Sequence, residues 1–291
     1  MKVARSPDEL AWARRAVALG TFDGIHAGHR RVIDAAVATG LRTAVVTFHP
    51  HPRSALGEHV ELISTLERRL ELFAESGVDD VLVLHFTQAL ARVEPELFAL
   101  DVLDPIGAEI VVAGTNFRFG LDRRGDLELL SGLGYCGRPV PLVEGVSSSA
   151  IRKLVGAGEV ERAAPLLGRP VEVEGVVVRG DARGNTLGYP TANLDVEPDV
   201  LVPAFGIYAG AVGATRAAVS IGTNPQYDGK ERRIEAFLLD WDGDLYGRRL
   251  VIELWCRLRD EQAFGSEREL VEQIARDVDD TRAASRPVEP A

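Results

Sequence analysis

The sequence predicts two domains: a doubly wound α/β domain, then an antiparallel β-barrel with a terminal helix. The length of 291 residues is enough for two domains that each bury a core. The first half alternates short apolar runs with amphipathic stretches, whereas the second half consists of short strand-like runs between turns. This change in the pattern of apolar and polar residues occurs near residue 168. We therefore expect domains at 1–165 and 166–283, followed by a disordered tail at 284–291.

Four apolar runs in the first half have the composition of buried parallel strands. They are AVALG (16–20), TAVVTF (43–48), VLVLHF (81–86) and EIVVAG (109–114). Between the second and third runs, apolar residues recur at helical spacing. Ser64 and Glu67 have the spacing of a capping box there, and Gly77 is suited to end the helix. Strand–helix–strand repetition predicts a doubly wound sheet, in which ligands bind at the carboxyl ends of the strands.

The second half contains shorter runs that partly alternate between apolar and polar residues, as expected of barrel strands. These runs are VEVEGVVV (171–178), GIYAGAV (206–212), AAVSIG (217–222), RIEAFLLDW (233–241) and LVIELWCRLR (250–259). In the last run the alternation places Leu250, Ile252, Leu254, Cys256 and Leu258 on one face. A second capping box at 266–269 begins the terminal helix.

Composition excludes several classes of protein. A net charge of −11 argues against a nucleic-acid partner, because affinity for phosphate backbones comes from clustered Lys and Arg. The two cysteines, Cys136 and Cys256, are far apart in sequence and do not predict a disulfide framework. The N-terminus lacks the apolar core of a signal peptide, and the least polar window contains Arg216 and several glycines. We expect a cytoplasmic protein without a membrane partner.

The stretch GTFDGIHAGH (20–29) follows the first predicted strand and precedes a helical pattern. Its glycines allow a close backbone approach, and the N–H groups of the following helix favour an anion. His26 and His29 are three residues apart and can face the same way on a first helical turn. Two imidazoles beside a helix N-terminus suit a phosphate whose charge grows during displacement. Two interpretations compete with this one: histidines that merely cap the loop, and a zinc site, for which a third ligand is not evident nearby in the sequence.

The loop resembles the T/GxxDxxHxGH motif of the nucleotidyltransferase superfamily. The segments that follow are similar, in order, to the adenylyltransferase half of the bacterial bifunctional riboflavin kinase/FAD synthetase family. They are TFHPHP (47–52), VVAGTNFRFG (111–120), RRGD (123–126) and VSSSAIRKLVGAGEVERAAPLLGRP (146–170). In the second half, GNTLGYPTANL (184–194) resembles the GxLGFPTANL signature of the kinase half of the same family. It is followed by SIGTNPQYDG (220–229), RIEAFLLDWDGDLYG (233–247) and LRDEQAF (258–264).

For the first domain the resemblance implies a Rossmann-like nucleotidyltransferase that transfers AMP from ATP to FMN and releases pyrophosphate. His26 and His29 would stabilise the developing charge, and Asn116 and Arg118 would contact the flavin. The residues implied to bind nucleotide and phosphate are Gly20, Phe22, Asp23, Gly28, Ser147, Ser148, Ser149 and Arg152. From the residues alone, a Ser triplet before a helix could equally be an N-cap.

For the second domain the resemblance implies a riboflavin kinase barrel that makes FMN. A P-loop is absent from the sequence, so a kinase here would be of another type. Thr191 and Asn193 would hold Mg²⁺ beside the ATP phosphates. Glu235 would be the general base, although a Glu on a strand can simply face solvent. The loop residues implied to close over ATP are Gly180 and Arg183, and those implied to line the flavin site are Arg259, Glu261 and Phe264.

The resemblance is incomplete at four positions: His49, Ala150, Gln226 and Tyr227. Two other interpretations therefore remain open: a chain in which only the kinase is active, and a non-catalytic flavin- or nucleotide-binding protein. The expected partners are riboflavin, FMN, FAD and ATP, with ATP and Mg²⁺ needed at each site. We expect a monomer or a weak oligomer. The stretch GLGYCG (132–137) matches a dinucleotide fingerprint but lacks the strand–helix context, so we interpret it as a turn.

Overall fold

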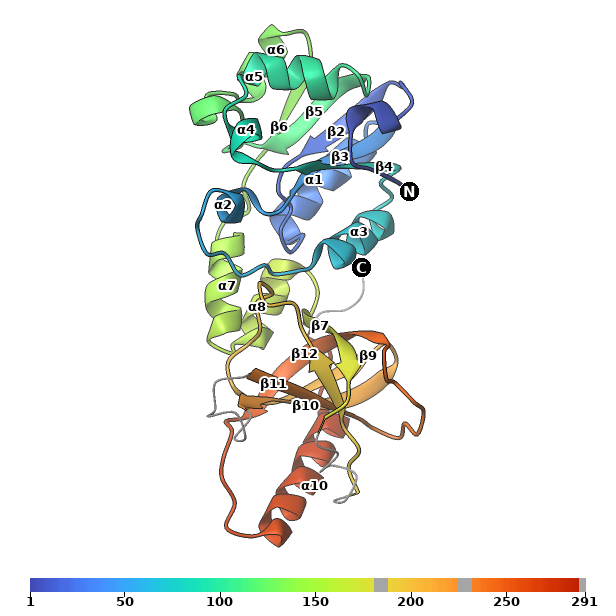
Figure 1. Cartoon of the computed structure of the whole chain (residues 1–291), viewed down its shortest axis with the longest axis vertical. Coiled ribbons are helices and arrows are strands. Elements are labelled where there is room, and N and C mark those ends of the chain that lie inside the picture. The colour runs from blue at the N-terminus through green and yellow to red at the C-terminus, as the bar shows by residue number, and fades with distance from the viewer. Residues whose placement is uncertain (181–187, 224–231, 288–291) are drawn as a thin grey trace. The chain divides into compact units, whose positions relative to one another are not determined.

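The computed structural model of this chain describes residues 1–180, 188–223 and 232–287. The chain forms two compact units, Met1–Ser148 and Ser149–Ala291, coloured blue to green and green to red in Figure 1. The division falls in the first turn of helix α7 (Ser148–Gly156), so α7 and helix α8 (Val160–Leu167) belong to the second unit. The domain boundary at residue 165 stays a prediction.

The first unit is built on a six-stranded parallel sheet with the order β1-β4-β3-β2-β5-β6. Its strands are β1 (Lys2–Ala4), β2 (Arg15–Leu19), β3 (Arg42–His49), β4 (Asp80–His85), β5 (Ala108–Gly114) and β6 (Cys136–Val140). The four predicted strands are therefore confirmed as β2, β3, β4 and β5. Within GLGYCG, Gly132 ends a helix, residues 133–134 form the predicted turn, and Cys136 and Gly137 begin β6. The segment PLVEG (141–145), which follows β6, is not a strand.

Helices cover both faces of this sheet (Figure 1) because its strands carry apolar residues on both sides. In β2, Val17 and Leu19 belong to one core cluster, and Ala16 and Ala18 belong to the other. The helical segments of the unit are η1 (Pro7–Glu9), α1 (Ala27–Val37), α2 (Pro52–Ala55), α3 (Leu66–Glu75), α4 (Gln88–Ala91), α5 (Pro95–Phe98), η2 (Ala99–Leu103), η3 (Leu121–Arg123) and α6 (Leu127–Gly132).

The predicted N-cap of α3 is wrong by one residue. Thr65, not Ser64, caps the helix: its hydroxyl accepts a hydrogen bond from the backbone N–H of Arg68 at 3.0 Å. The Ser64 hydroxyl instead accepts the N–H of Gly24 at 3.2 Å, so it holds the 20–29 loop. Gly77, with φ +77°, follows the end of the helix as predicted.

The second unit is a closed antiparallel barrel with the strand order β10-β11-β8-β7-β12-β9. Its strands are β7 (Val171–Val178), β8 (Ala192–Asp195), β9 (Gly206–Val212), β10 (Thr215–Thr223), β11 (Arg232–Leu238) and β12 (Arg249–Arg259). The predicted inward face of β12 holds for Leu250, Ile252 and Leu254, which are all buried. A register shift between Leu254 and Cys256 ends this alternation, so the prediction is wrong beyond Leu254.

The terminal helix α10 (Glu267–Ala283) is confirmed, with the hydroxyl of Ser266 accepting the N–H of Glu269. The structure differs from the expected disordered tail at its start. Arg286 forms an ion pair with Glu253 at 2.7 Å, while residues 288–291 lie outside the described part of the chain. Among the helices in the described residues, none is both long and apolar enough to cross a membrane.

Candidate functional site

The 20–29 loop lies where the strand order of the sheet reverses. β2 is flanked by β3 on one side and β5 on the other, and the chain leaves β2 at Leu19 directly into this loop. Crevices at such a reversal, outside the carboxyl ends of the strands, are the usual ligand sites of doubly wound sheets. Helix α1 begins at Ala27 and directs its first N–H groups to the same place.

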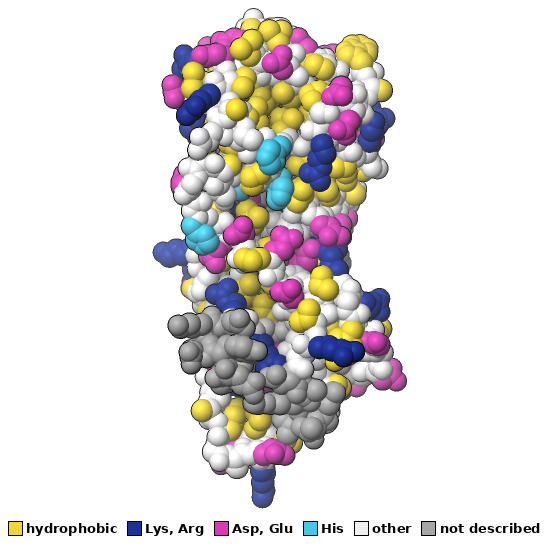
Figure 2. Space-filling view, viewed as in Figure 1, with side chains coloured by type: hydrophobic (Ala, Val, Ile, Leu, Met, Phe, Trp, Pro, Cys, Tyr) yellow, Lys and Arg dark blue, Asp and Glu magenta, His cyan; other side chains and the backbone are white. Residues whose placement is uncertain are grey.

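His26 and His29 lie against each other on this loop. His26 is the N-cap of α1, and its Nδ1 accepts the N–H of His29 at 3.2 Å. The two imidazole rings stack with centroids 3.6 Å apart and an interplanar angle of 12°. Phe22 packs edge-on against His29 at 5.3 Å. The predicted histidine pair is therefore one rigid cluster. Figure 2 shows histidine side chains on the visible face of the first unit.

His29 is electrically neutral at pH 7. Burial of the imidazole, together with the nearby His26 and Arg69, holds the pKa of His29 well below its ordinary value. Its Nδ1 is buried and has no hydrogen-bond partner among the described residues. A neutral imidazole can donate one hydrogen bond to a phosphate oxygen, but it cannot supply a full charge.

Glycines and a buried carboxylate fix the shape of this loop. Gly28 leaves room for the His26 ring, because a Cβ there would lie 3.2 Å from its Cε1. Gly20 does the same for Phe22, again at 3.2 Å. Asp23 is only 2% exposed, and its Oδ1 accepts the backbone N–H of Ile63 at 3.0 Å. Asp23 therefore holds the loop to the chain before α3.

The serine segment divides between the two units. Ser148 contacts the loop: its hydroxyl donates to the carbonyl of Asp23 at 3.3 Å. Ser147 is an exposed residue of the first unit, whereas Ser149 and Arg152 are assigned to the second. Within the first unit, the structure therefore brings Ser148 to the histidine loop.

Asn116 and Arg118 follow strand β5 and are both exposed. Arg118 lines a cavity of about 390 Å³ with Phe117 and Leu127, at the ends of β5 and β6. Its guanidinium lies 3.8 Å from Asp126, and it donates to the carbonyl of Phe117 at 2.8 Å. Asn116 is not among the lining residues.

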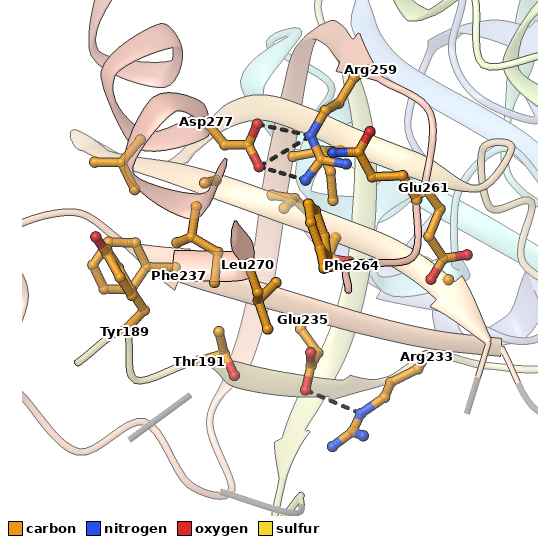
Figure 3. A pocket seen from close by; sticks show the side chains of 18 of the residues that line it. Tyr189, Thr191, Arg233, Glu235, Phe237, Arg259, Glu261, Phe264, Leu270 and Asp277 are labelled. Atoms are coloured by element: carbon orange, nitrogen blue, oxygen red, sulfur yellow. Dashed lines mark hydrogen bonds and ion pairs between the residues drawn. The ribbon is translucent and has the colours of Figure 1, made fainter. Parts of the chain in front are cut away.

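In the second unit, helix α10 and the barrel enclose a cavity of about 410 Å³, which we call the helix-side cavity (Figure 3). Strands β10 and β11 form its floor, and the segment after β12 closes one end. Aromatic and aliphatic side chains supply most of its wall: Tyr189, Phe237, Phe264, Leu270, Ile274 and Val278. Tyr189 and Phe237 meet edge-on, with centroids 5.3 Å apart.

Glu235 and Thr191 point into this cavity, close to Asn193. Glu235 of β11 and Asn193 of β8 are direct partners across two hydrogen-bonded strands. Thr191 immediately precedes β8 and lines the cavity with Glu235. A Cβ at Gly180 would lie 2.4 Å from the Asn193 side chain, so only glycine leaves this approach open. The structure thus brings together four of the residues implied for the kinase.

Arg259, Glu261 and Phe264 also line the helix-side cavity. Arg259 is held by Asp277 of α10, with Nη2 at 2.7 Å from Oδ2 and Nε at 2.9 Å from Oδ1. The remaining nitrogen, Nη1, donates to the carbonyl of Asp260 at 2.9 Å. Arg259 therefore lines the cavity and also forms an ion pair with Asp277 in the cavity wall.

A second cavity, of about 350 Å³, lies at the turn between β11 and β12, and we call it the turn-side cavity. Its wall includes Trp241, Leu245 and Tyr246 of that turn, together with Pro190 and Thr191. Thr191 therefore lines both cavities.

Arg183, Gln226 and Tyr227 lie outside the described residues. Within residues 1–180, 188–223 and 232–287, no group of three or more His, Cys, Asp or Glu side chains could hold a metal ion. The zinc interpretation of the histidine pair thus finds no third ligand in that part of the chain.

Sequence reasoning missed the contribution of α10 to the helix-side cavity. Leu270, Ile274 and Val278 recur every four residues, and this apolar stripe was the signal that could have identified the wall. Arg233 and Asp277 gave no such signal, because their contacts depend on which strands and helices are neighbours.

Comparisons with known proteins agree with this division. A family model described as FAD synthetase matches residues 8–151, and one described as riboflavin kinase matches residues 167–285. Curated relatives named bifunctional riboflavin kinase/FMN adenylyltransferase match nearly the whole chain. The relative from Listeria monocytogenes is 35% identical over 95% of this chain and 94% of its own length. This chain belongs to that family.

Two further relatives support the assignment. The Bacillus subtilis protein of the same name is 35% identical over 91% of this chain and 90% of its own. The Escherichia coli one is 34% identical, over 95% and 96% respectively. A solved structure from Streptococcus pneumoniae, described as a macrolide-efflux protein, is 32% identical with a TM-score of 0.87. The match covers 97% of this chain and 99% of the Streptococcus pneumoniae chain. A protein of the same fold is thus described by another activity.

Proposed function

We propose that the barrel unit phosphorylates riboflavin to FMN and that the first unit adenylylates FMN to FAD. Both steps use ATP, the first releasing ADP and the second pyrophosphate. The observation that carries the kinase proposal is the position of Thr191 in the wall of two cavities, with Glu235 and Asn193 beside it. Two substrates that each occupy one cavity would meet at this point.

The helix-side cavity suits the isoalloxazine ring of riboflavin. Its aromatic and aliphatic side chains match a flat ring system, and the polar and charged side chains between them can bind the polar edge of that ring. Glu235 lies near Thr191 in the wall of this cavity (Figure 3), and Asn193 is its partner on the neighbouring strand, which suits the ribityl chain. The turn-side cavity, with Trp241 and Tyr246, suits the adenine of ATP.

In the kinase step, Glu235 accepts the proton of the ribityl hydroxyl as its oxygen attacks the γ-phosphorus and ADP leaves. Thr191 and Asn193 offer a hydroxyl and an amide oxygen, which are hard donors suited to Mg²⁺. Gly180 supports this fit, because a Cβ would fill the space beside the Asn193 amide. A metal held there would neutralise phosphate charge.

In the adenylyltransferase step, the FMN phosphate attacks the α-phosphorus of ATP, and pyrophosphate leaves. No enzyme nucleophile is required, so the residues need only align the phosphates and stabilise charge. The first N–H groups of α1, His26 and neutral His29 supply hydrogen-bond donors for this purpose. We also assign phosphate contacts to Ser147, Ser148, Ser149 and Arg152, and flavin contacts to Asn116 and Arg118.

A chromatographic time course tests the proposal. The wild-type chain with riboflavin, ATP and Mg²⁺ is expected to form FMN first and FAD later. His29→Ala is expected to stop at FMN, whereas Glu235→Gln is expected to convert added FMN to FAD but leave riboflavin unchanged. Loss of general-base catalysis typically costs about 10²–10⁴-fold in rate.

The variants act as controls for each other because each leaves the other unit unchanged. FMN accumulation by the wild-type chain without FAD would restrict the function to the kinase. Loss of both activities in folded Glu235→Gln would contradict separate sites.

A further inference from the structure

Arg233 joins two groups to which the proposed mechanism gives separate tasks. Its Nε lies 2.9 Å from Oδ1 of Asn193 and 3.1 Å from Oε1 of Glu235. Arg233 and Glu235 are two residues apart on β11, so their side chains point to the same face of the barrel wall. Figure 3 shows the pair from within the helix-side cavity, with the ion pair dashed.

The chemistry of these groups requires a donor between them. The amide oxygen of Asn193 and the carboxylate of Glu235 are both acceptors, and the β8–β11 register places the two residues side by side. A guanidinium has only donors, so it attracts both oxygens and turns the amide oxygen, not the amide NH₂, toward itself. That oxygen is the atom a hard cation would use.

We propose that Arg233 is a positioning residue for phosphoryl transfer in the barrel. It fixes the carboxylate of Glu235 and the amide oxygen of Asn193 relative to each other, so that the group that accepts the ribityl proton and the group that would hold the metal beside the phosphates serve the same transfer. This inference rests on the roles proposed for Glu235 and Asn193. The Arg233 side chain is 21% exposed and that of Glu235 is 30% exposed, so both side chains stay accessible to substrates.

The test compares Arg233→Gln and Arg233→Lys with Arg232→Gln in the full chain. Arg232 is a matched control: it is the adjacent arginine of β11, exposed, with its guanidinium 5.9 Å from the ring of Phe205. We expect Arg233→Gln to lower kcat for FMN formation by about 10–100-fold, the scale of a misplaced catalytic group, and to leave KM for riboflavin and ATP within about 3-fold. Arg233→Lys should recover much of the loss, because an ammonium also donates to both oxygens. Arg232→Gln should resemble wild type.

A second measurement does not depend on turnover. In the ¹⁵N-labelled full chain, the side-chain amide signals of Asn193 (assigned by their loss in Asn193→Ser) should shift in Arg233→Gln and stay in place in Arg232→Gln. Conversion of FMN to FAD reports whether the first unit is intact in each variant, and the thermal unfolding curve reports whether the barrel is folded. If Arg233→Gln unfolds, the kcat of Arg233→Lys and the Asn193 amide signals in that variant serve as the test instead.

The outcomes separate this inference from the proposed function. If Glu235→Gln retains kinase activity, the proposed role of Glu235 is wrong. If Glu235→Gln is inactive but Arg233→Gln keeps the wild-type kcat, the positioning role is wrong. A raised KM for ATP with unchanged kcat would make Arg233 a nucleotide-binding residue and overturn the proposal, as would unmoved Asn193 signals.

Discussion

Gly180 affects the kinase site because it has no side chain. A Cβ there would lie 2.4 Å from the Asn193 side chain, closer than van der Waals contact permits. We expect Gly180→Ala to displace the Asn193 amide and to lower FMN formation by about 10–100-fold, as misplacement of a ligand does. FMN adenylylation should not change. Gly156→Ala, in the same unit with no atom within 4 Å of the new Cβ, is the control. Equal effects of both substitutions would contradict this explanation.

His29 gives a prediction about pH. Its pKa lies well below the ordinary value because of burial and the nearby His26 and Arg69. The neutral form therefore persists below pH 6.5, and FAD formation should show no change near pH 6.5 that arises from protonation of His29. Protonation favours the unfolded state, so the stability that neutral His29 contributes is complete above about pH 6.5 and falls as the pH drops below it. An NMR titration of His29 with a midpoint at or above 6.5 would contradict this.

At the residue scale, motif positions were predictable and contact positions were not. His26, His29, Thr191 and Glu235 lie in segments whose order is typical of the family. Arg233 begins one of these segments, but its role could not be predicted, because that role arises only when β8 and β11 become neighbours.

At the scale of elements, α10 is attached to the barrel through Arg259 and Asp277. Asp277 is 5% exposed and also accepts the side-chain amide of Gln273 at 2.9 Å. Asp277→Asn should lower the melting temperature, because removing one partner of a buried ion pair lowers the free energy of unfolding by about 3–5 kcal/mol. It should also raise KM for riboflavin by about 10-fold, because the helix-side cavity loses one wall. Steady-state kinetics and thermal unfolding measure both effects.

The control for that experiment lies on the same helix. Arg268 and Glu272 form an ion pair at 2.8 Å with side chains 88% and 51% exposed, so Glu272→Gln should change stability by less than about 1 kcal/mol. An Asp277→Asn variant with wild-type KM and melting temperature would show that α10 needs no such attachment.

The first unit contains a comparable buried ion cluster at the starts of its strands. Arg15 and Arg42 both bind Asp80, at 2.9 and 2.6 Å, and the Asp80 side chain is 0% exposed. Burial raises the pKa of Asp80, but the hydrogen bonds from Arg42 and Arg15 outweigh it and hold the pKa below its ordinary value. The cluster therefore contributes stability above about pH 4 that is lost as the pH falls further.

Asp80→Asn should accordingly lower the free energy of unfolding by about 3 kcal/mol at pH 7, measured by urea denaturation, and less at pH 3. Glu109→Gln, which breaks the exposed pair with Arg14, is the comparison and should cost little. An equal loss at both pH values for Asp80→Asn would contradict the electrostatic account.

Elements with strong patterns were predictable from the sequence. The four buried strands and the terminal helix have runs or caps long enough to identify them. β1 and β6 were not, since β1 has three residues and β6 combines glycine, proline and mostly exposed positions. Their strand conformation depends on pairing with β4 and β5.

At the scale of the whole molecule, the proposal assigns the two reactions to different residues of one chain. A mixture of His29→Ala and Glu235→Gln chains should therefore form FAD from riboflavin, because FMN made by the first can diffuse to the second. Each variant alone should not. We expect a lag before FAD appears, and this lag should shorten as the protein concentration rises. Chromatography of samples taken over time measures the lag. Failure of the mixture to form FAD would mean that FMN does not leave its chain.

The position of Thr191 in both cavities affects how this barrel could be redesigned. A substitution there would alter the fit of both substrates at once, so it cannot retune the preference for one alone. Strand β11 also contributes to both walls, but each cavity has one segment of its own: 259–278 on the helix side and 241–246 on the turn side. An engineer could therefore vary the flavin analogue accepted through the first segment and the nucleoside triphosphate through the second, provided that the threonine between them is left unchanged.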